Sequence, residues 1–269
     1  MQRHAGPLAR EFMGKGVVTV ALDEKVQNAI RAMDAHNIGS IVVLDSLGPC
    51  GVFTERDLLS RVLARGKDPE TTTIAQVASP KLPTIEASRT LEETAAAMID
   101  KKSRLLVFEG AKLVGIVTPT DVVRTLRGAV EDFSILRFIS TRVVTVLPET
   151  SMDIVVRMMD ERKIGSIIVA EEGEWVGILT ERDLLRRILA RGRGLDTQVR
   201  EVASKPLVTA RPGILGKEAA ETMALHGFKR LPLTLNGEGI GIVTARDVVE
   251  AYAAVNRPLA PRVDWVQWN

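Results

Sequence analysis

Four short motifs in this sequence combine a hydroxyl group with a carboxylate, and three of the four add a guanidinium. In each motif a glycine and two apolar residues precede a threonine, and an aspartate follows three positions later. The motifs are Gly51-Val52-Phe53-Thr54-Glu55-Arg56-Asp57, Gly115-Ile116-Val117-Thr118-Pro119-Thr120-Asp121, Gly177-Ile178-Leu179-Thr180-Glu181-Arg182-Asp183 and Gly241-Ile242-Val243-Thr244-Ala245-Arg246-Asp247. Such groups suit a nucleoside phosphate, because a carboxylate accepts from ribose hydroxyls while a hydroxyl and a guanidinium donate to phosphate.

A second interpretation of the motif is a helix cap that needs no ligand. Thr54 would accept from a backbone N–H of the first turn, and Asp57 would reach back as the acidic partner of a capping box. Capping does not explain Arg56, Arg182 and Arg246, which place a cation where the helix dipole opposes it. An anion is therefore expected there, and removal of Arg182 should leave the unliganded protein unharmed or slightly more stable.

The motifs belong to an internal repeat that covers most of the chain. The stretch Thr54–Leu59 recurs without a gap as Thr180–Leu185, and Ile38–Ile41 recurs as Ile164–Ile167, both 126 positions later. Within each half, a weaker copy of the motif follows 64 positions after the first. We predict four units in two consecutive pairs, here called repeats 1 to 4, over 1–66, 67–128, 129–192 and 193–255, with a tail over 256–269.

Each repeat is expected to fold as βαββα. It begins with a β-branched run such as Val17–Val20, continues as a helix, and then forms a hairpin from Ile41–Leu44 and Val52–Phe53. A last helix begins at the motif and ends at Gly66. Between the halves, Val130–Leu136 is expected to form a linker helix. The predicted fold class is α+β.

Composition argues against several classes of function. The 269 residues include 36 basic and 34 acidic side chains, so the net charge of +2 creates no general attraction to nucleic acid or an anionic membrane. Cys50 is the single cysteine, and His4, His36 and His226 are scattered, so no metal-ligand pattern results. Residues 1–16 lack the apolar h-region of a signal peptide, and no uninterrupted apolar run approaches the roughly 20 residues that cross a bilayer. We expect a cytoplasmic protein that binds no membrane.

In its paired βαββα units and its four motifs, the chain resembles the cystathionine-β-synthase (CBS) domain family. The resemblance covers nearly the whole chain. It implies that consecutive repeats pair through their sheets, that each pair contains two clefts, and that two pairs pack as a flat disc. Because one chain supplies both pairs, either a monomer or a homodimer is expected.

The resemblance also implies which residues would contact an adenosine-containing ligand. The ribose would be held by Asp57, Asp121, Asp183 and Asp247. The phosphate would be held by the motif residues Thr54, Arg56, Thr118, Thr120, Thr180, Arg182, Thr244 and Arg246 and by the second-strand residues Arg104, Lys229 and Arg230. Repeats 1 and 3 depart from this basic pattern with Gly39-Ser40 and Gly165-Ser166. The base would lie against Phe12, Met13, Val77, Ala78, Phe138, Ile139, Val202 and Ala203.

We therefore expect a non-catalytic regulatory protein that binds AMP, ADP, ATP or S-adenosylmethionine, requires no cofactor, and acts on an unidentified protein partner. Outside the repeats there is no Walker-type loop and no Ser/His/Asp set. Two alternatives stay open. One is a nucleic-acid binder using Arg186-Arg187 and Arg191-Gly192-Arg193, which the aromatic content of 4% does not favour. The other is a structural subunit, and the tail with Trp265 and Trp268 would either pack back or contact a partner.

Overall fold

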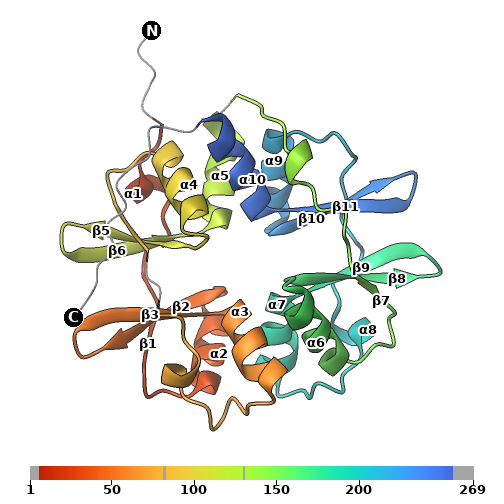
Figure 1. The fold of residues 1–269 in the computed structure, drawn as a ribbon, viewed down its shortest axis with the longest axis horizontal. Coiled ribbons are helices and arrows are strands. Elements are labelled where there is room, and N and C mark those ends of the chain that lie inside the picture. The colour runs from red at the N-terminus through yellow and green to blue at the C-terminus, as the bar shows by residue number, and fades with distance from the viewer. Residues whose placement is uncertain (1–5, 81–82, 130, 257–269) are drawn as a thin grey trace.

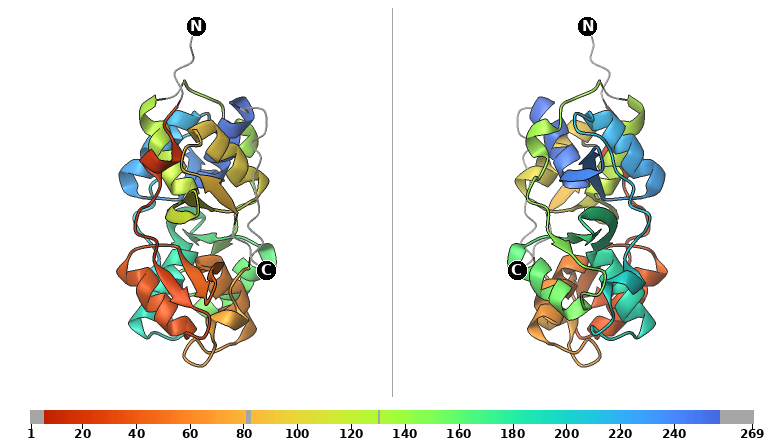
Figure 2. Two further views of the ribbon diagram at one scale, coloured as in Figure 1. Left: turned by 90° about the vertical axis from the view of Figure 1, so that its left-hand side faces the viewer. Right: turned by 90° about the vertical axis from the view of Figure 1, so that its right-hand side faces the viewer.

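Each motif lies where a β-hairpin ends and a helix begins. A computed structural model describes residues 6–80, 83–129 and 131–256, and the four predicted repeats form four units of small sheets and helices. Figure 1 shows repeats 1 and 2 on one side of the molecule and repeats 3 and 4 on the other. In the side views of Figure 2, the sheets of repeats 2 and 4 lie in the upper half and those of repeats 1 and 3 in the lower half, while residues 9–12 of repeat 1 lie with the upper half. The α+β class is confirmed, whereas the flat disc stays a prediction.

The elements follow the same order in each repeat, except that the described residues of repeat 4 form no strand before helix α9 (Gly216–His226). Repeat 1 contains α1 (Ala9–Phe12), β1 (Thr19–Ala21), α2 (Val26–Ala35), β2 (Ser40–Asp45), β3 (Gly48–Thr54), α3 (Glu55–Asp57), η1 (Leu58–Val62) and η2 (Leu63–Arg65). Repeat 2 contains η3 (Ile74–Gln76), β4 (Thr84–Glu86), α4 (Leu91–Asp100), β5 (Leu105–Glu109), β6 (Lys112–Val117) and α5 (Pro119–Ala129). Repeat 3 contains η4 (Leu136–Phe138), β7 (Thr145–Val146), α6 (Met152–Arg162), β8 (Ser166–Glu171), β9 (Glu174–Thr180), α7 (Glu181–Asp183), η5 (Leu184–Ile188) and η6 (Leu189–Arg191). Repeat 4 contains α8 (Val199–Val202), α9 (Gly216–His226), β10 (Arg230–Leu235), β11 (Glu238–Thr244) and α10 (Ala245–Val255).

The sheets of repeats 1 to 3 share one topology. The first strand runs parallel to the second and the second antiparallel to the third, so that Val43 lies opposite both Val20 and Gly51 in repeat 1. Repeat 4 has the two strands β10 and β11, with an isolated parallel bridge from Ala210 to Leu233 at the position of the first strand. The predicted hairpin is thus confirmed in every repeat, and it delivers the chain directly to the motif.

The helix after the motif has mixed geometry in repeats 1 and 3. The three-residue α3 and α7 continue as five-residue π-helical segments and three-residue 3-10 turns. Gly66 and Gly192 end these helices with φ of 61° and 66°, a left-handed conformation that glycine adopts without steric cost. The predicted end at Gly66 is confirmed. In repeats 2 and 4 the motif leads into the 11-residue helices α5 and α10.

The linker between the halves differs from the prediction. Residues 131–135 are not helical, so the linker helix expected over Val130–Leu136 is wrong for these residues, and Leu136 begins the 3-10 turn η4. Phe133 and Ile135 are both buried and belong to the core of repeats 2 and 4. The Phe133 ring packs on Tyr252, with 5.7 Å between ring centroids, and fills the space beside Gly216. The tail expected to pack back or to contact a partner lies outside the described residues.

Two large apolar cores join the halves of the chain. One contains helix residues of repeats 1 and 3, such as Leu58 and Leu184, and the other contains residues of repeats 2 and 4, such as Val122 and Val248. Helices therefore connect equivalent repeats of the two halves. This arrangement brings the first motif close to the third.

Consecutive repeats meet through their sheets, as the resemblance implies. Val42 of repeat 1 forms a small apolar cluster with Leu106 and Phe108 of repeat 2. In the other pair, the Trp175 ring on β9 lies so close to Gly239 on β11 that a Cβ there would collide with it. Each motif therefore lies next to the sheet of its partner repeat.

Candidate functional site

In every motif the aspartate carboxylate accepts a hydrogen bond from the backbone N–H or the hydroxyl of its threonine. The Thr180 backbone N–H and the Thr180 hydroxyl both donate to Asp183 Oδ2, at 2.8 and 2.7 Å. In repeat 1, the Thr54 hydroxyl donates to Asp57 Oδ2 at 2.7 Å and accepts from the Asp57 N–H at 3.0 Å. Thr118 with Asp121 and Thr244 with Asp247 repeat parts of this pattern. The predicted capping geometry is confirmed.

Capping does not exhaust the aspartates' capacity to accept hydrogen bonds. Asp57 and Asp183 are 7% and 8% exposed, and burial raises the pKa of both carboxyl groups while the threonines, Arg61 and Arg187 offset it in part. The two arginines lie 3.3 Å from the Oδ1 atoms of these aspartates. Because a carboxylate has about four acceptor positions, ribose hydroxyls can still donate to it.

The motif arginines of repeats 1 and 3 cross from one repeat to the other. Arg56 Nε lies 2.7 Å from Glu181 Oε1, and Arg182 Nε lies 3.1 Å from Glu55 Oε1. The glutamates are 7–8% exposed. These reciprocal ion pairs explain why a cation is tolerated in the first helical turn. Sequence reasoning missed Glu55 and Glu181, although their presence in the first and third motifs only was a usable signal.

Basic residues at the start of the second strands add to the same cluster. Lys229 Nζ lies 3.1 Å from Glu55 Oε2, and Arg230 Nη2 lies 3.5 Å from Glu181 Oε2. Arg104 donates to the Gly39 carbonyl at 3.3 Å. Repeats 2 and 4 thus direct three of the predicted phosphate-binding cations toward the motifs of repeats 1 and 3.

The glycines that replace basic residues in repeats 1 and 3 make room for these ion pairs. A Cβ on Gly39 would lie 2.7 Å from Lys229 Nζ and 2.9 Å from Glu55 Oε2. A Cβ on Gly165 would collide with the Arg230 guanidinium. The departure from the basic pattern therefore has a steric cause, because the charge at this place comes from another repeat.

The two buried glutamates differ in their pKa. Burial is the largest influence and raises the pKa of both carboxyl groups. At Glu55, Lys229 and Arg182 outweigh burial, so the pKa falls below its ordinary value. At Glu181, Arg230 and Arg56 do not outweigh burial, and repulsion from Glu55 adds to it, so the pKa is raised. Two copies of one motif therefore hold differently stabilised carboxylates.

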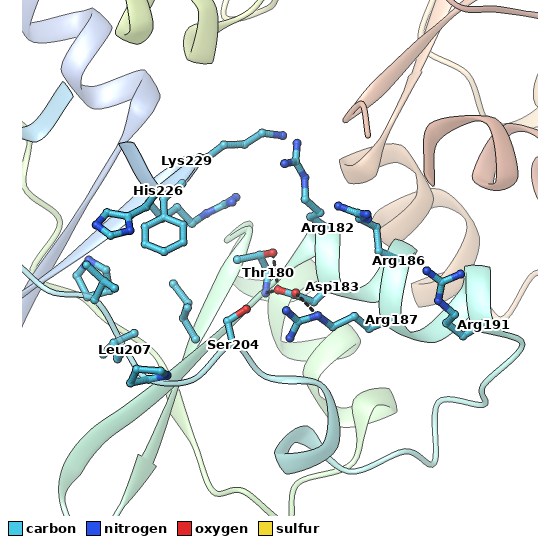
Figure 3. Close-up of a pocket in the computed structure, with 17 residues that line it drawn as sticks. Thr180, Arg182, Asp183, Arg186, Arg187, Arg191, Ser204, Leu207, His226 and Lys229 are labelled. Atoms are coloured by element: carbon cyan, nitrogen blue, oxygen red, sulfur yellow. Dashed lines mark hydrogen bonds and ion pairs between the residues drawn. The ribbon is translucent and has the colours of Figure 1, made fainter. Parts of the chain in front are cut away.

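A cavity of about 520 Å³ lies between repeats 3 and 4 beside the third motif (Figure 3). Its polar wall includes Thr180 and Asp183, and Figure 3 shows Ser204 close to both. The apolar part is formed by Ile178, Pro206, Leu207, Val208, Phe228 and Pro232. Phe228 stacks on His226 with 5.2 Å between ring centroids. A cavity of this size with an apolar wall and a few convergent polar groups is typical of a small-molecule site.

The remaining predicted residues lie in different surroundings. Arg246 donates to the Lys102 carbonyl at 3.0 Å, and Thr118 and Thr120 are partly buried in the second motif. Among the predicted base-binding residues, Val77 and Val202 are buried in the core of repeats 1 and 3, where Ala78 and Ala203 pack against it. Phe12, Met13, Phe138 and Ile139 pack against the core of repeats 2 and 4. Their contact with a base stays a prediction, and the cavity instead uses residues shortly after Ala203.

Metal and membrane functions receive no support from the described residues. Within 6–80, 83–129 and 131–256, no group of three or more His, Cys, Asp or Glu side chains is arranged to hold a metal ion. Among the helices in these same ranges, none combines the length and apolar character needed to span a membrane.

Comparison with known proteins identifies the family. A family model described as CBS domain matches residues 9–64, 74–128, 130–190 and 199–254. The matches cover more than half of the sequence, and the chain therefore belongs to the CBS-domain family. It is 36% identical over 109 residues to the CBS domain-containing protein YhcV of Bacillus subtilis, covering 40% of this chain and 78% of that protein.

Two further matches cover nearly the whole chain. The chain is 24% identical over 269 residues to the uncharacterized protein MJ1404 of Methanocaldococcus jannaschii, covering 92% of this chain and 62% of that protein. The crystal structure of MJ1225 from the same organism, described as a candidate archaeal homologue of g-AMPK, has a TM-score of 0.75 at 18% identity. That comparison covers 92% of this chain and 100% of MJ1225, and shows a shared fold.

Proposed function

We propose that this protein is a non-catalytic regulatory protein that binds adenosine-containing ligands, with one site beside the third motif. The observation that carries this proposal is the cavity between repeats 3 and 4, where Thr180 and Asp183 face an apolar wall and the basic residues Lys229 and Arg230. Membership of the CBS-domain family supports a regulatory ligand-binding role. The ligands proposed are AMP, ADP, ATP or S-adenosylmethionine, and no cofactor is required.

Each part of the nucleotide has a matching wall of the cavity. Asp183 would accept from ribose hydroxyls, while Thr180 and Lys229 would donate to phosphate. The base would lie among the apolar residues, between Leu207 and the ring of Phe228. None of these contacts requires a chemical step, so the proposed role is binding and not turnover.

Nucleic-acid binding through the arginine cluster is less well supported. Arg186 Nε lies 2.9 Å from Asp34 Oδ1, Arg191 lies 3.6 Å from Asp34 Oδ2, and Arg193 lies 3.6 Å from Glu201. These arginines have acidic partners inside the chain, which reduces the free positive charge available to a phosphate backbone.

A thermal-shift panel tests the proposal. AMP, ADP, ATP and S-adenosylmethionine would each be added to the full chain, with a short RNA as the competing class. A ligand at 100 times its dissociation constant should stabilise the fold by about 2.7 kcal/mol. Stabilisation by RNA alone would favour the nucleic-acid alternative, and an unchanged Tm with every compound would overturn both.

Asp183→Asn separates ligand binding from capping. Asparagine is also a good capping residue, so the helix should lose little stability, whereas ribose loses a charged acceptor and affinity should fall by about 1.5–3 kcal/mol. Asp121→Asn is the matched control, because Asp121 does not line this cavity. Calorimetry that finds equal affinity in wild type and Asp183→Asn would assign the third motif to capping alone.

A further inference from the structure

Two of the cations that the cavity offers to a phosphate are already paired with a carboxylate from outside the cavity. Arg182 and Lys229 both line the cavity, and Figure 3 shows the ends of their side chains close together. Arg182 Nε lies 3.1 Å from Glu55 Oε1, and Lys229 Nζ lies 3.1 Å from Glu55 Oε2. Glu55 belongs to repeat 1 and does not line the cavity. One carboxylate from the other half of the chain therefore pairs with both cations.

Glu55 is a fixed negative charge. Its backbone N–H donates to the Gly39 carbonyl at 3.2 Å, and it lies in the first turn of the helix after Thr54, where the helix dipole favours a carboxylate. Burial raises the pKa of its carboxyl group, but Lys229 and Arg182 outweigh burial and hold the pKa below its ordinary value. Glu55 is therefore charged near neutral pH. Its side chain is only 9% exposed, so water and salt screen this charge little.

The two cations are accessible from the cavity while they contact Glu55. The side chains of Arg182 and Lys229 are 29% and 31% exposed. A guanidinium has five N–H donors and an ammonium has three, so both can donate to a phosphate without leaving Glu55. A phosphate held in this way would lie close to the Glu55 carboxylate, and repulsion between the two anions would be screened only in part. Glu55 should therefore reduce the affinity that a phosphate adds.

We propose that Glu55 is a specificity-determining residue of the cavity, because its carboxylate competes with the phosphate of a ligand for Arg182 and Lys229. This proposal rests on the proposed function, since it takes an adenosine-containing ligand to bind beside Thr180 and Asp183. A ligand with a phosphate weakens the ion pairs that connect repeat 1 to repeats 3 and 4. Adenosine leaves these ion pairs intact. Repeat 1 thus responds to the phosphate of a ligand bound in the other half of the chain.

Three buried carboxylates form a matched series for testing this competition. Each pairs with two cations, and the three differ in how many of these cations line the cavity. Both partners of Glu55 line it, one partner of Glu181 does, namely Arg230, and neither partner of Asp160 does. The effect of removing the charge should therefore decrease from Glu55 to Glu181 to Asp160.

Calorimetry on the full chain with AMP and adenosine measures this order. Glu55→Gln should strengthen AMP binding about tenfold, as for one additional charge-assisted bond, and should change adenosine affinity less than about twofold. Glu181→Gln should strengthen AMP binding less, and Asp160→Asn should change neither affinity. If Glu55→Gln changes AMP and adenosine equally, or changes neither, the competition is wrong while adenosine binding stands. If neither compound binds the wild type or any variant, the proposed function is wrong as well.

A measurement on the wild-type protein covers the case in which Glu55→Gln does not fold. Carbon-detected NMR can follow the side-chain carboxyl carbons of Glu55 and Asp160. AMP should shift the Glu55 resonance, because a phosphate changes the electric field at this carboxylate, and adenosine should shift it much less. Neither compound should shift the Asp160 resonance. A Glu55 resonance that AMP leaves in place, or that adenosine shifts equally, would contradict the competition.

Discussion

Repeats 1 and 3 contain the same Thr-Glu-Arg-Asp sequence, yet their buried glutamates differ in electrostatic surroundings. Glu55 has ion pairs with Arg182 and Lys229, both at 3.1 Å, and its pKa is lowered. Glu181 has Arg56 at 2.7 Å and Arg230 at 3.5 Å, and its pKa is raised. Arg56 Nε is 2.7 Å from Glu181 Oε1 as an ion pair, yet among the described residues Glu181 Oε1 and Arg56 Nη1 are buried atoms that form no hydrogen bond. The pair at Glu181 is therefore the less satisfied of the two.

The cause of this difference lies in repeats 2 and 4. Lys229 of repeat 4 reaches Glu55 of repeat 1, which belongs to the other pair. The equivalent position in repeat 2 is Ser103, which has no charge to offer Glu181. The comparison shows that a duplicated motif acquires its properties from neighbours that have diverged.

The largest effect is expected when each glutamate loses its charge. Glu55→Gln should cost about 3 kcal/mol of unfolding free energy, because Arg182 and Lys229 lose a shared buried carboxylate. Glu181→Gln should cost no more than about 1 kcal/mol, because the lost ion pair is offset by the removal of an incompletely compensated buried charge. Urea unfolding of both variants measures the difference, and equal costs would show that the two surroundings are equivalent.

Removing the motif arginine that pairs with Glu55 should cost more unfolding free energy than removing the one that pairs with Glu181. Both costs should be smaller than that of Glu55→Gln. Arg182→Ala should destabilise the unliganded protein by about 2 kcal/mol, because its charge-assisted bond to buried Glu55 is lost. This reverses the expectation from the helix dipole alone, which considered no partner for the arginine. Arg56→Ala is the matched control and should cost less. Unchanged stability in Arg182→Ala would show that the unfavourable interaction of Arg182 with the helix dipole cancels its ion pair with Glu55.

A cation at position 103 should reduce the difference between the surroundings of Glu55 and Glu181. Ser103→Lys places an ammonium group at the position equivalent to Lys229, and should stabilise the fold by about 0.5–1 kcal/mol through Glu181. The same change should lower the pKa of Glu181, which carbon-detected NMR can follow. Ser103→Met provides a side chain of similar length without charge. If the methionine variant is equally stabilised, packing and not charge explains the gain.

The smallest effect is an opposite pH dependence of the two glutamates. The raised pKa of Glu181 means that its contribution to stability is present below the ordinary value of 4.5 and is lost as pH rises through the folded-state pKa. The lowered pKa of Glu55 gives a contribution that is present above 4.5 and is lost as pH falls through its folded-state pKa. Unfolding free energies from about pH 3 to 7 should therefore show a flatter acidic limb in Glu55→Gln and a smaller decline above 4.5 in Glu181→Gln. Parallel curves for both variants would contradict the assigned directions.

Local sequence patterns predicted the secondary-structure elements and their order. Hydrophobic spacing and the motif predicted the hairpins and the helix starts, and glycine at position 66 predicted a helix end, because each depends on residues close in sequence. The linker over residues 131–135 was mispredicted as a helix, because Phe133 is fixed by contacts with Tyr252 and Gly216, which are distant in sequence.

The sequence by itself determined the four repeats, their pairing, the capped motifs and the set of groups suited to a nucleotide, because periodicity and local hydrogen bonding specify these features. Only the tertiary structure decided that Arg182 meets Glu55 across 127 positions and that Lys229 reaches the same carboxylate across 174. Ion pairs between distant residues depend on how the helices of repeats 1 and 3 pack and where repeat 4 lies against them. No local pattern contains that information, because the two glutamates have identical neighbours in sequence and different neighbours in space.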